Sequence, residues 1–111
     1  MIVEDDTATR NGLEMLLQRA GYDVLATDSV PGGRRALEEA APDLLIADVR
    51  LGEFNGLQLI AMSGRPIPAI VVTAFVDPAL EADARRLGAH YLVKPIMPGE
   101  LLSLVEELLR P

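Results

Sequence analysis

Five short apolar stretches of this chain alternate with five longer segments of helical periodicity, and this alternation restricts the fold more than any other feature. The expected strands cover residues 1–5, 22–27, 43–48, 68–73 and 90–94, and the expected helices cover residues 7–20, 31–40, 56–62, 78–88 and 98–110. Several of the strands are almost continuously apolar, which is typical of strands buried on both faces. The pattern therefore predicts one α/β domain over residues 1–111, in which helices cover both faces of a parallel sheet.

Local signals support most of these helices but not all of them equally. Asp6 or Thr7 can cap the first helix. Gly32 and Gly33 weaken the helical signal of the second, because glycine costs up to about 1 kcal/mol relative to alanine inside a helix. Residues 49–55 contain no periodic pattern and are expected to form a loop.

Composition excludes several classes of protein. The 111 residues include 10 Lys and Arg against 17 Asp and Glu, which gives a net charge of −7. So acidic a chain lacks the basic surface that nucleic-acid binding requires, and its two tyrosines and two phenylalanines are too few for a base-stacking platform. The absence of cysteine excludes disulfides and thiolate chemistry. No apolar run approaches the ~18 residues of a membrane span, and the acidic start does not resemble a secretory signal, so we expect a cytoplasmic location.

Four of the five expected strands end in residues with chemical capability. Glu4 and Asp5 end the first strand, and Asp48, Thr73 and Lys94 end the third, fourth and fifth. In open parallel sheets the carboxyl ends of the strands meet at one edge, where ligands bind. We therefore expect these side chains to lie close together.

The gathered side chains suggest phosphoryl chemistry. Carboxylates brought together repel one another, and a divalent cation with oxygen ligands relieves that repulsion. Mg²⁺ suits one or two carboxylates, waters and a phosphoryl oxygen. Lys94 and the hydroxyl of Thr73 could bond the remaining phosphoryl oxygens, and Asp48 could then act as the nucleophile.

These residues and their surroundings resemble the receiver domain of two-component response regulators. The matching pieces are IVEDD at 2–6, LLIADVRL at 44–51 with Gly56, VVTA at 71–74 and YLVKP at 91–95. Each piece alone is common, since an aspartate often follows an apolar strand. All of them occur in the family's order and together span nearly the whole chain. The resemblance implies a three-layer, doubly wound, flavodoxin-like (βα)5 fold with strand order 2-1-3-4-5.

The resemblance also implies a role for each matching residue. Asp48 would accept the phosphoryl group, and Thr73 and Lys94 would bond its oxygens. Asp5 would ligate Mg²⁺ directly, Glu4 would hold it through water, and the backbone carbonyl of Arg50 would complete the protein ligands. Tyr91 would be an aromatic switch that turns inward when Thr73 moves. The Lys94–Pro95 peptide would be cis, and Arg50 and Phe75 would flank the site where the family tunes phosphoryl loss.

The function implied is that of a phosphorylation-controlled signalling switch, not an enzyme that turns over an external substrate. A sensor histidine kinase or phosphotransfer protein would donate the phosphoryl group. The face made by the fourth helix, fifth strand and fifth helix would then regulate an output domain, a partner or a second copy of the chain. Direct binding of nucleic acid or membrane by this segment is not expected.

Other interpretations of the same residues stay open at this point. The chain could be a pseudo-receiver, a constitutive protein-binding module that performs no phosphotransfer. A phosphatase with an aspartyl nucleophile would carry a second aspartate two residues after the first, where this chain has Arg50. Tyr91 could simply pack at the edge of the sheet. His90, the one histidine, is interpreted as a surface residue.

Overall fold

The computed structural model describes residues 1–50, 56–64 and 66–110, so the expected loop at 49–55 lies mostly outside the described residues. The described strands and helices alternate as the sequence predicts. They are β1 (Ile2–Val3), α1 (Thr7–Arg19), β2 (Ala26–Thr27), α2 (Val30–Ala40), β3 (Leu45–Asp48), α3 (Gly56–Met62), β4 (Ala69–Thr73), α4 (Pro78–Arg86), β5 (His90–Val93) and α5 (Pro98–Leu109).

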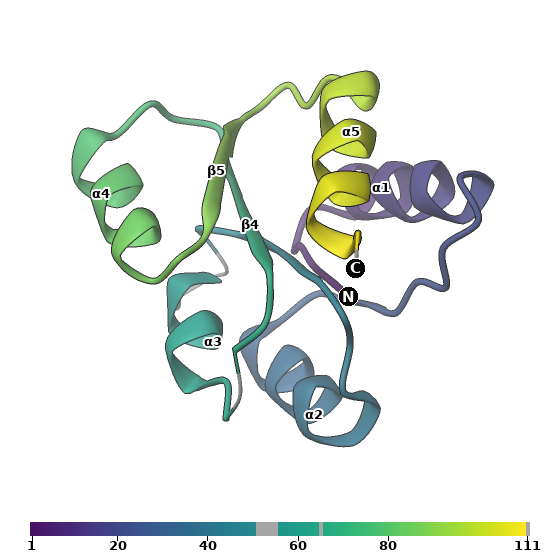
Figure 1. Ribbon diagram of the computed structural model, residues 1–111, viewed down its shortest axis with the longest axis horizontal. Coiled ribbons are helices and arrows are strands. Elements are labelled where there is room, and N and C mark those ends of the chain that lie inside the picture. Colours follow the sequence, from purple (N-terminus) through teal and green to yellow (C-terminus); the bar gives the residue numbers. More distant parts are fainter. Residues whose placement is uncertain (51–55, 65, 111) are drawn as a thin grey trace.

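The strands form one parallel sheet in the order β2-β1-β3-β4-β5, which confirms the order implied by the receiver resemblance. Helices α2, α3 and α4 lie on one side of the sheet, and α1 and α5 lie on the other (Figure 1). The chain therefore has the three-layer, flavodoxin-like (βα)5 fold.

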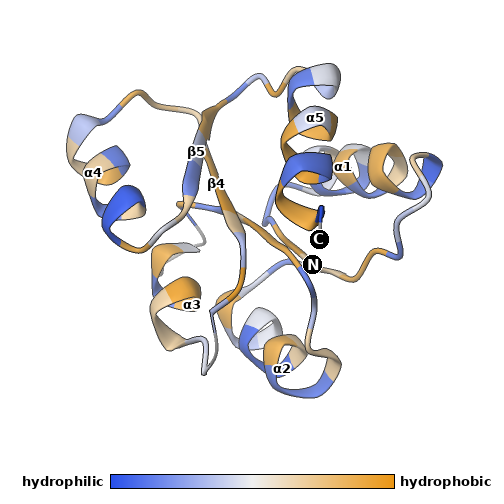
Figure 2. Ribbon diagram, in the orientation of Figure 1, coloured by the Kyte–Doolittle hydropathy of each residue, from blue (hydrophilic) through white to orange (hydrophobic). Residues whose placement is uncertain are grey.

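The central strands divide their side chains between two hydrophobic cores. Leu45 and Val71 belong to the core beneath α2, α3 and α4, whereas Ile46 and Val72 belong to the core beneath α1 and α5. Successive residues of a strand point to opposite faces, so an uninterrupted apolar strand supplies both cores. Figure 2 shows the hydrophobic residues along the strands and on the helix sides that face them.

Helix α2 forms despite its glycines and packs closely on the sheet at both of them. A Cβ on Gly33 would lie 2.9 Å from a methyl of Val3, and one on Gly32 would lie 2.2 Å from the hydroxyl of Thr27. The side chain of Ser29 accepts a hydrogen bond from the Gly32 amide and caps the helix. The two residues that weaken the helix locally thus permit its close approach to the sheet.

Strand β2 is shorter than predicted. The sequence indicated residues 22–27, but only Ala26 and Thr27 pair, with Ile2 and Val3 of β1. An edge strand has a single neighbour, and β1 offers it only two paired residues, so pairing cannot extend further. Tyr22 contributes to the core beneath α1 and α5 instead of the sheet.

Two smaller expectations are settled by the backbone. Asp6 caps α1, because its side chain accepts a hydrogen bond from the Thr9 amide at 2.9 Å. The Lys94–Pro95 peptide is cis, as the resemblance implied. Within the described part of the chain, none of the helices has the length and apolar character needed to cross a membrane.

Candidate functional site

The sheet brings the predicted site residues to one edge. Asp48 is the last residue of β3 and Thr73 the last of β4, and both are buried. Glu4 and Asp5 follow β1 directly, and Lys94 follows β5. Because β3 lies between β1 and β4, and β5 flanks β4, all these residues surround the carboxyl end of β3.

Lys94 joins the acids of β1 and β3. Its ammonium nitrogen Nζ lies 2.6 Å from Oε1 of Glu4 and 2.7 Å from Oδ2 of Asp48. The side chain of Glu4 is 1% exposed, that of Asp48 9% and that of Lys94 21%. Two largely buried carboxylates therefore share one cation, which offsets part of the cost of removing their charges from water.

Backbone amides fix the orientation of both carboxylates. The Arg50 amide donates to Oδ1 of Asp48 at 2.8 Å, and the Asp6 amide donates to Oε2 of Glu4 at 3.3 Å. Asp48 thus accepts one hydrogen bond on each oxygen, from Arg50 and from Lys94. Its carboxylate is held in one orientation at the end of its strand.

Burial and the neighbouring charges shift the pKa values of Glu4 and Lys94. Burial raises the pKa of Glu4 to about 7, a rise that the hydrogen bond from Lys94 opposes and the neighbouring Asp48 reinforces. Burial acts to lower the pKa of Lys94, but its hydrogen bonds and attraction to Asp48 and Glu4 raise it. At neutral pH the cluster therefore holds Lys94 charged, while its single glutamate, Glu4, is close to its titration midpoint.

The pKa of Glu4 leads to a prediction for the metal-free protein. In the folded state this pKa lies above its ordinary value of 4.5, so between pH 4.5 and about 7 the folded state binds more protons than the unfolded state. The contribution of Glu4 to the free energy of unfolding therefore falls as the pH rises through this window, by on the order of 2–3 kcal/mol. Urea unfolding in chelator at several pH values measures it.

Two variants isolate this effect from other titrating groups. Glu4→Gln should lose the decline between pH 4.5 and 7, whereas Glu39→Gln, the same change at an exposed position of α2, should keep it. A Glu4→Gln profile with the same slope as the wild type would contradict the prediction.

The acidic residues fit a hard divalent cation. Glu4, Asp5 and Asp48 each offer a carboxylate oxygen, and these oxygens lie within 4.8 Å of one another. Glu4 and Asp48 are buried, whereas Asp5 is exposed. Oxygen donors of this kind are the ligands that Mg²⁺ takes in proteins. The carbonyl of Arg50, two residues after Asp48, stays a predicted ligand.

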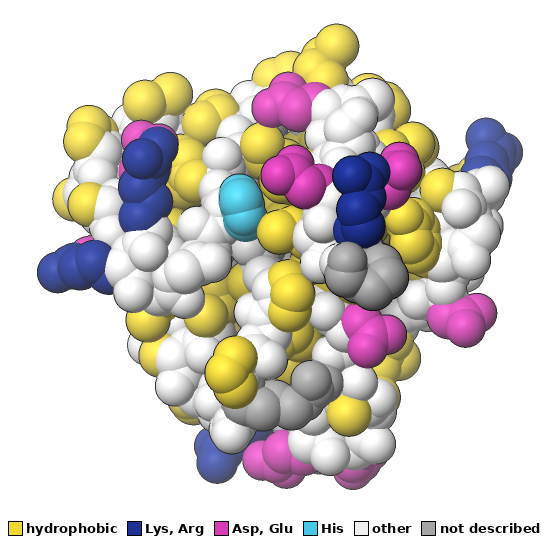
Figure 3. Space-filling model, viewed as in Figure 1, with side chains coloured by type: hydrophobic (Ala, Val, Ile, Leu, Met, Phe, Trp, Pro, Cys, Tyr) yellow, Lys and Arg dark blue, Asp and Glu magenta, His cyan; other side chains and the backbone are white. Residues whose placement is uncertain are grey.

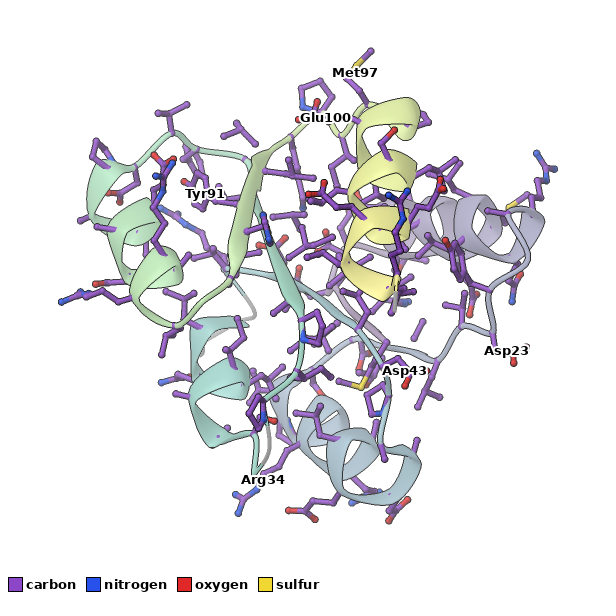
Figure 4. The ribbon with its side chains drawn as sticks, viewed as in Figure 1. Asp23, Arg34, Asp43, Tyr91, Met97 and Glu100 are labelled. Atoms are coloured by element: carbon purple, nitrogen blue, oxygen red, sulfur yellow. The ribbon has the colours of Figure 1, made fainter. Side chains whose placement is uncertain are left out.

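Thr73 and Tyr91 are linked through Phe75. The hydroxyl of Thr73 accepts a hydrogen bond from the Phe75 amide at 3.2 Å, and the hydroxyl of Tyr91 donates to the Phe75 carbonyl at 3.0 Å. Tyr91 belongs to β5 and is partly buried against the core, and its hydroxyl lies beside the segment that precedes α4 (Figure 4). A movement of Thr73 could thus reach Tyr91 through one residue. Whether Tyr91 switches stays a prediction.

His90 is exposed, as expected.

Arg50 and Phe75 also meet through their side chains. The guanidinium of Arg50 lies 4.4 Å from the centre of the Phe75 ring, a cation–π contact between the ends of β3 and β4. The Phe75 side chain is 53% exposed. The sequence placed both residues beside the site but did not indicate this contact.

One residue at the site was not found from the sequence. Arg10, in the first turns of α1, donates from Nη1 to the backbone carbonyl of Glu4 at 2.9 Å. Its position four residues after the helix cap Asp6 was the available signal, because residues four apart share one face of a helix. Nothing in the composition distinguishes it from the other arginines.

The sequence matches the family "Response regulator receiver domain" over residues 1–106, so the chain belongs to the receiver domains of response regulators. Receiver domains are signalling switches of two-component systems rather than enzymes that turn over an external substrate. Among curated relatives, the chain is 34% identical to an uncharacterized 14.6 kDa protein of Leptolyngbya boryana, over 96% of this chain and 86% of that protein.

Two further relatives are longer than this chain. It is 29% identical to the transcriptional regulatory protein FixJ of Bradyrhizobium diazoefficiens and 37% identical to the probable transcriptional regulatory protein SilR of Salmonella typhimurium. The matches cover 98% and 99% of this chain but only 55% and 50% of those proteins. The chain thus spans about half the length of these regulators.

Solved structures agree with the family assignment. A CheY-like receiver domain protein of Methanospirillum hungatei superimposes with a TM-score of 0.90 and 28% identity, over 96% of this chain and 88% of that one. A response regulator of Burkholderia pseudomallei, solved with a phosphorylated aspartic acid, a calcium ion and citrate, gives a TM-score of 0.85 and 25% identity, over 92% and 62%.

Proposed function

We propose that this chain, over residues 1–111, is one cytoplasmic receiver domain in which Asp48 accepts a phosphoryl group from a phosphohistidine. The donor would be a sensor histidine kinase or a phosphotransfer protein. The observation that carries the proposal is the setting of Asp48. Its buried carboxylate ends a central strand, with one oxygen bonded to Lys94 and the other to the Arg50 amide.

The proposed transfer uses the residues as follows. An oxygen of Asp48 forms a bond to phosphorus while the bond between phosphorus and the donor nitrogen breaks, and the donor imidazole leaves with its electron pair. Lys94, already 2.7 Å from Asp48, and the nearby hydroxyl of Thr73 donate to phosphoryl oxygens. A bound Mg²⁺ would neutralise the charge that develops there, held by Glu4, Asp5, Asp48 and the Arg50 carbonyl.

The proposed output is a change on the face made by α4, β5 and α5. If Thr73 turns toward the phosphoryl group, it releases the Phe75 amide, and the Phe75 carbonyl is the group that holds Tyr91. On this face both basic and acidic side chains lie over α4 and over α5 (Figure 3), and on α4 they pair as Arg85 with Glu81 and Arg86 with Asp83. The surface would regulate an output domain, a partner or a second copy, without binding nucleic acid or membrane itself.

The test is incubation of the purified chain with Mg²⁺ and a small acyl phosphate, followed by intact mass spectrometry. We expect one added phosphoryl group per chain with Mg²⁺, and none when a chelator replaces it. A chain that binds Mg²⁺ at millimolar concentration but gains no phosphoryl group from either an acyl phosphate or a histidine kinase would contradict the proposal. That result would support the pseudo-receiver alternative.

A further inference from the structure

We propose that Arg10 is a positioning residue for the metal site, which holds the Glu4–Asp5 segment in the conformation that binds a divalent cation. The inference rests on the proposed function in one respect, that the acidic cluster binds Mg²⁺. It goes further by assigning a role to a side chain that ligates neither the metal nor the phosphoryl group.

The first observation is where β1 ends. The strand pairs only through Ile2 and Val3, so Glu4 lies one residue beyond the last paired position. The Glu4 amide still donates to the Thr27 carbonyl on β2 at 3.0 Å. The Glu4 carbonyl instead accepts from Arg10 Nη1 at 2.9 Å. Arg10 therefore anchors the chain at the point where it leaves the sheet and enters the acidic cluster.

The second observation is how Arg10 itself is held. It is half-buried, and its amide donates to the Asp6 carbonyl at 2.9 Å in the first turn of α1. The Asp6 side chain caps that turn through the amide and hydroxyl of Thr9, at 2.9 and 2.6 Å. The first turn of the helix is thus hydrogen-bonded to its cap, and from it the Arg10 guanidinium extends back to the Glu4 carbonyl. Asp5 lies between Glu4 and Asp6, which Arg10 contacts through its guanidinium and its amide respectively.

The two roles that Arg10 could have predict opposite changes in Mg²⁺ affinity when its side chain is removed. A guanidinium near the cluster repels a divalent cation, so if charge were its only effect, its removal would tighten Mg²⁺ binding. If Arg10 positions the segment, its removal lets Glu4 and Asp5 move. Mg²⁺ binding must then order these residues, which costs conformational entropy and weakens the binding. Hydrogen bonds that involve a charged group contribute more than neutral ones, so we expect positioning to prevail.

The experiment is calorimetric titration of MgCl₂ into the metal-free chain. Arg10→Met keeps the length of the side chain and removes its donors, and should raise the Kd for Mg²⁺ by about three- to tenfold. Arg10→Lys keeps a donor and the charge and should recover most of the affinity. Arg19→Met removes the same charge from an exposed position of the same helix and should leave the Kd unchanged.

The outcomes separate this inference from the proposed function. Binding by Arg10→Met that is equal to or tighter than wild type would overturn the role of Arg10. If Arg10→Met does not fold, Arg10→Gln serves, because it is neutral but keeps a donor; positioning predicts weaker binding than wild type, whereas charge alone predicts tighter binding. A wild-type chain that binds no Mg²⁺ would overturn both proposals. A wild type that binds Mg²⁺ but accepts no phosphoryl group overturns only the proposed function.

Discussion

Asp48→Asn is expected to abolish the phosphoryl adduct that acyl phosphate and Mg²⁺ form on the wild-type chain. The amide oxygen can still accept the hydrogen bond from the Arg50 amide, and Lys94 loses Asp48 but keeps Glu4 as an acceptor, so the fold should persist. The variant nevertheless lacks the anionic oxygen that attacks phosphorus. Intact mass spectrometry of both proteins after the same incubation, with circular dichroism to confirm folding, measures the effect.

A matched control makes this result specific. Asp23→Asn carries the same change of charge at an exposed loop position, and Figure 4 shows Asp23 far from Tyr91 on the opposite side of the molecule. It should take up the phosphoryl group as the wild type does. An undiminished adduct on Asp48→Asn would mean that another carboxylate is the acceptor.

Lys94→Met is expected to give the second large effect, a loss of about 2–4 kcal/mol in the free energy of unfolding at pH 8 without metal. The ammonium of Lys94 is the cation shared by Glu4 and Asp48, and methionine leaves both buried carboxylates without it. Breaking a buried ion pair on one side costs more than the pair itself contributes, since the remaining charge stays desolvated. Urea unfolding in chelator measures the loss.

Conditions that neutralise the acids should reduce this loss. Below pH 7 Glu4 takes up a proton more readily, since its pKa is already about 7 in the presence of Lys94. Arg85→Met is the control, because it breaks an exposed pair with Glu81 on α4 and should cost less than about 1 kcal/mol. A Lys94→Met loss at pH 8 as small as that of Arg85→Met would contradict the account of the cluster.

The strand and helix pattern predicted the architecture because each element carries its own periodic signal. The buried strands β3 and β4 were visible as apolar runs, and α4 as the Asp77–Pro78 start. Strand β2 was overestimated, because its length depends on how many residues of β1 are available for pairing, which residues 22–27 do not encode. The glycines of α2 were interpreted as weakening the helical signal, whereas in the structure they permit the helix to pack closely on the sheet.

The members of the site could be predicted from the sequence, but their pairing could not. Glu4, Asp5, Asp48, Thr73 and Lys94 each lie at or just after the carboxyl end of a strand, and parallel strands bring such positions to one edge. Which acids Lys94 contacts depends on side chains that are 90 and 46 residues away from it in the sequence. The role of Arg10 depends on its hydrogen bond to the backbone carbonyl of Glu4. Because every residue has a backbone carbonyl, the sequence could not indicate this partner.

The central claim is that Asp48 is the phosphoacceptor, and locating the modified residue tests it most directly. The wild-type chain is phosphorylated with acyl phosphate and Mg²⁺, the acyl phosphate is reduced with borohydride to homoserine, and the peptides are sequenced by mass spectrometry. We predict homoserine at position 48 and at no other aspartate. Homoserine at a different aspartate, or none in a sample whose intact mass shows the adduct, would contradict the assignment of Asp48.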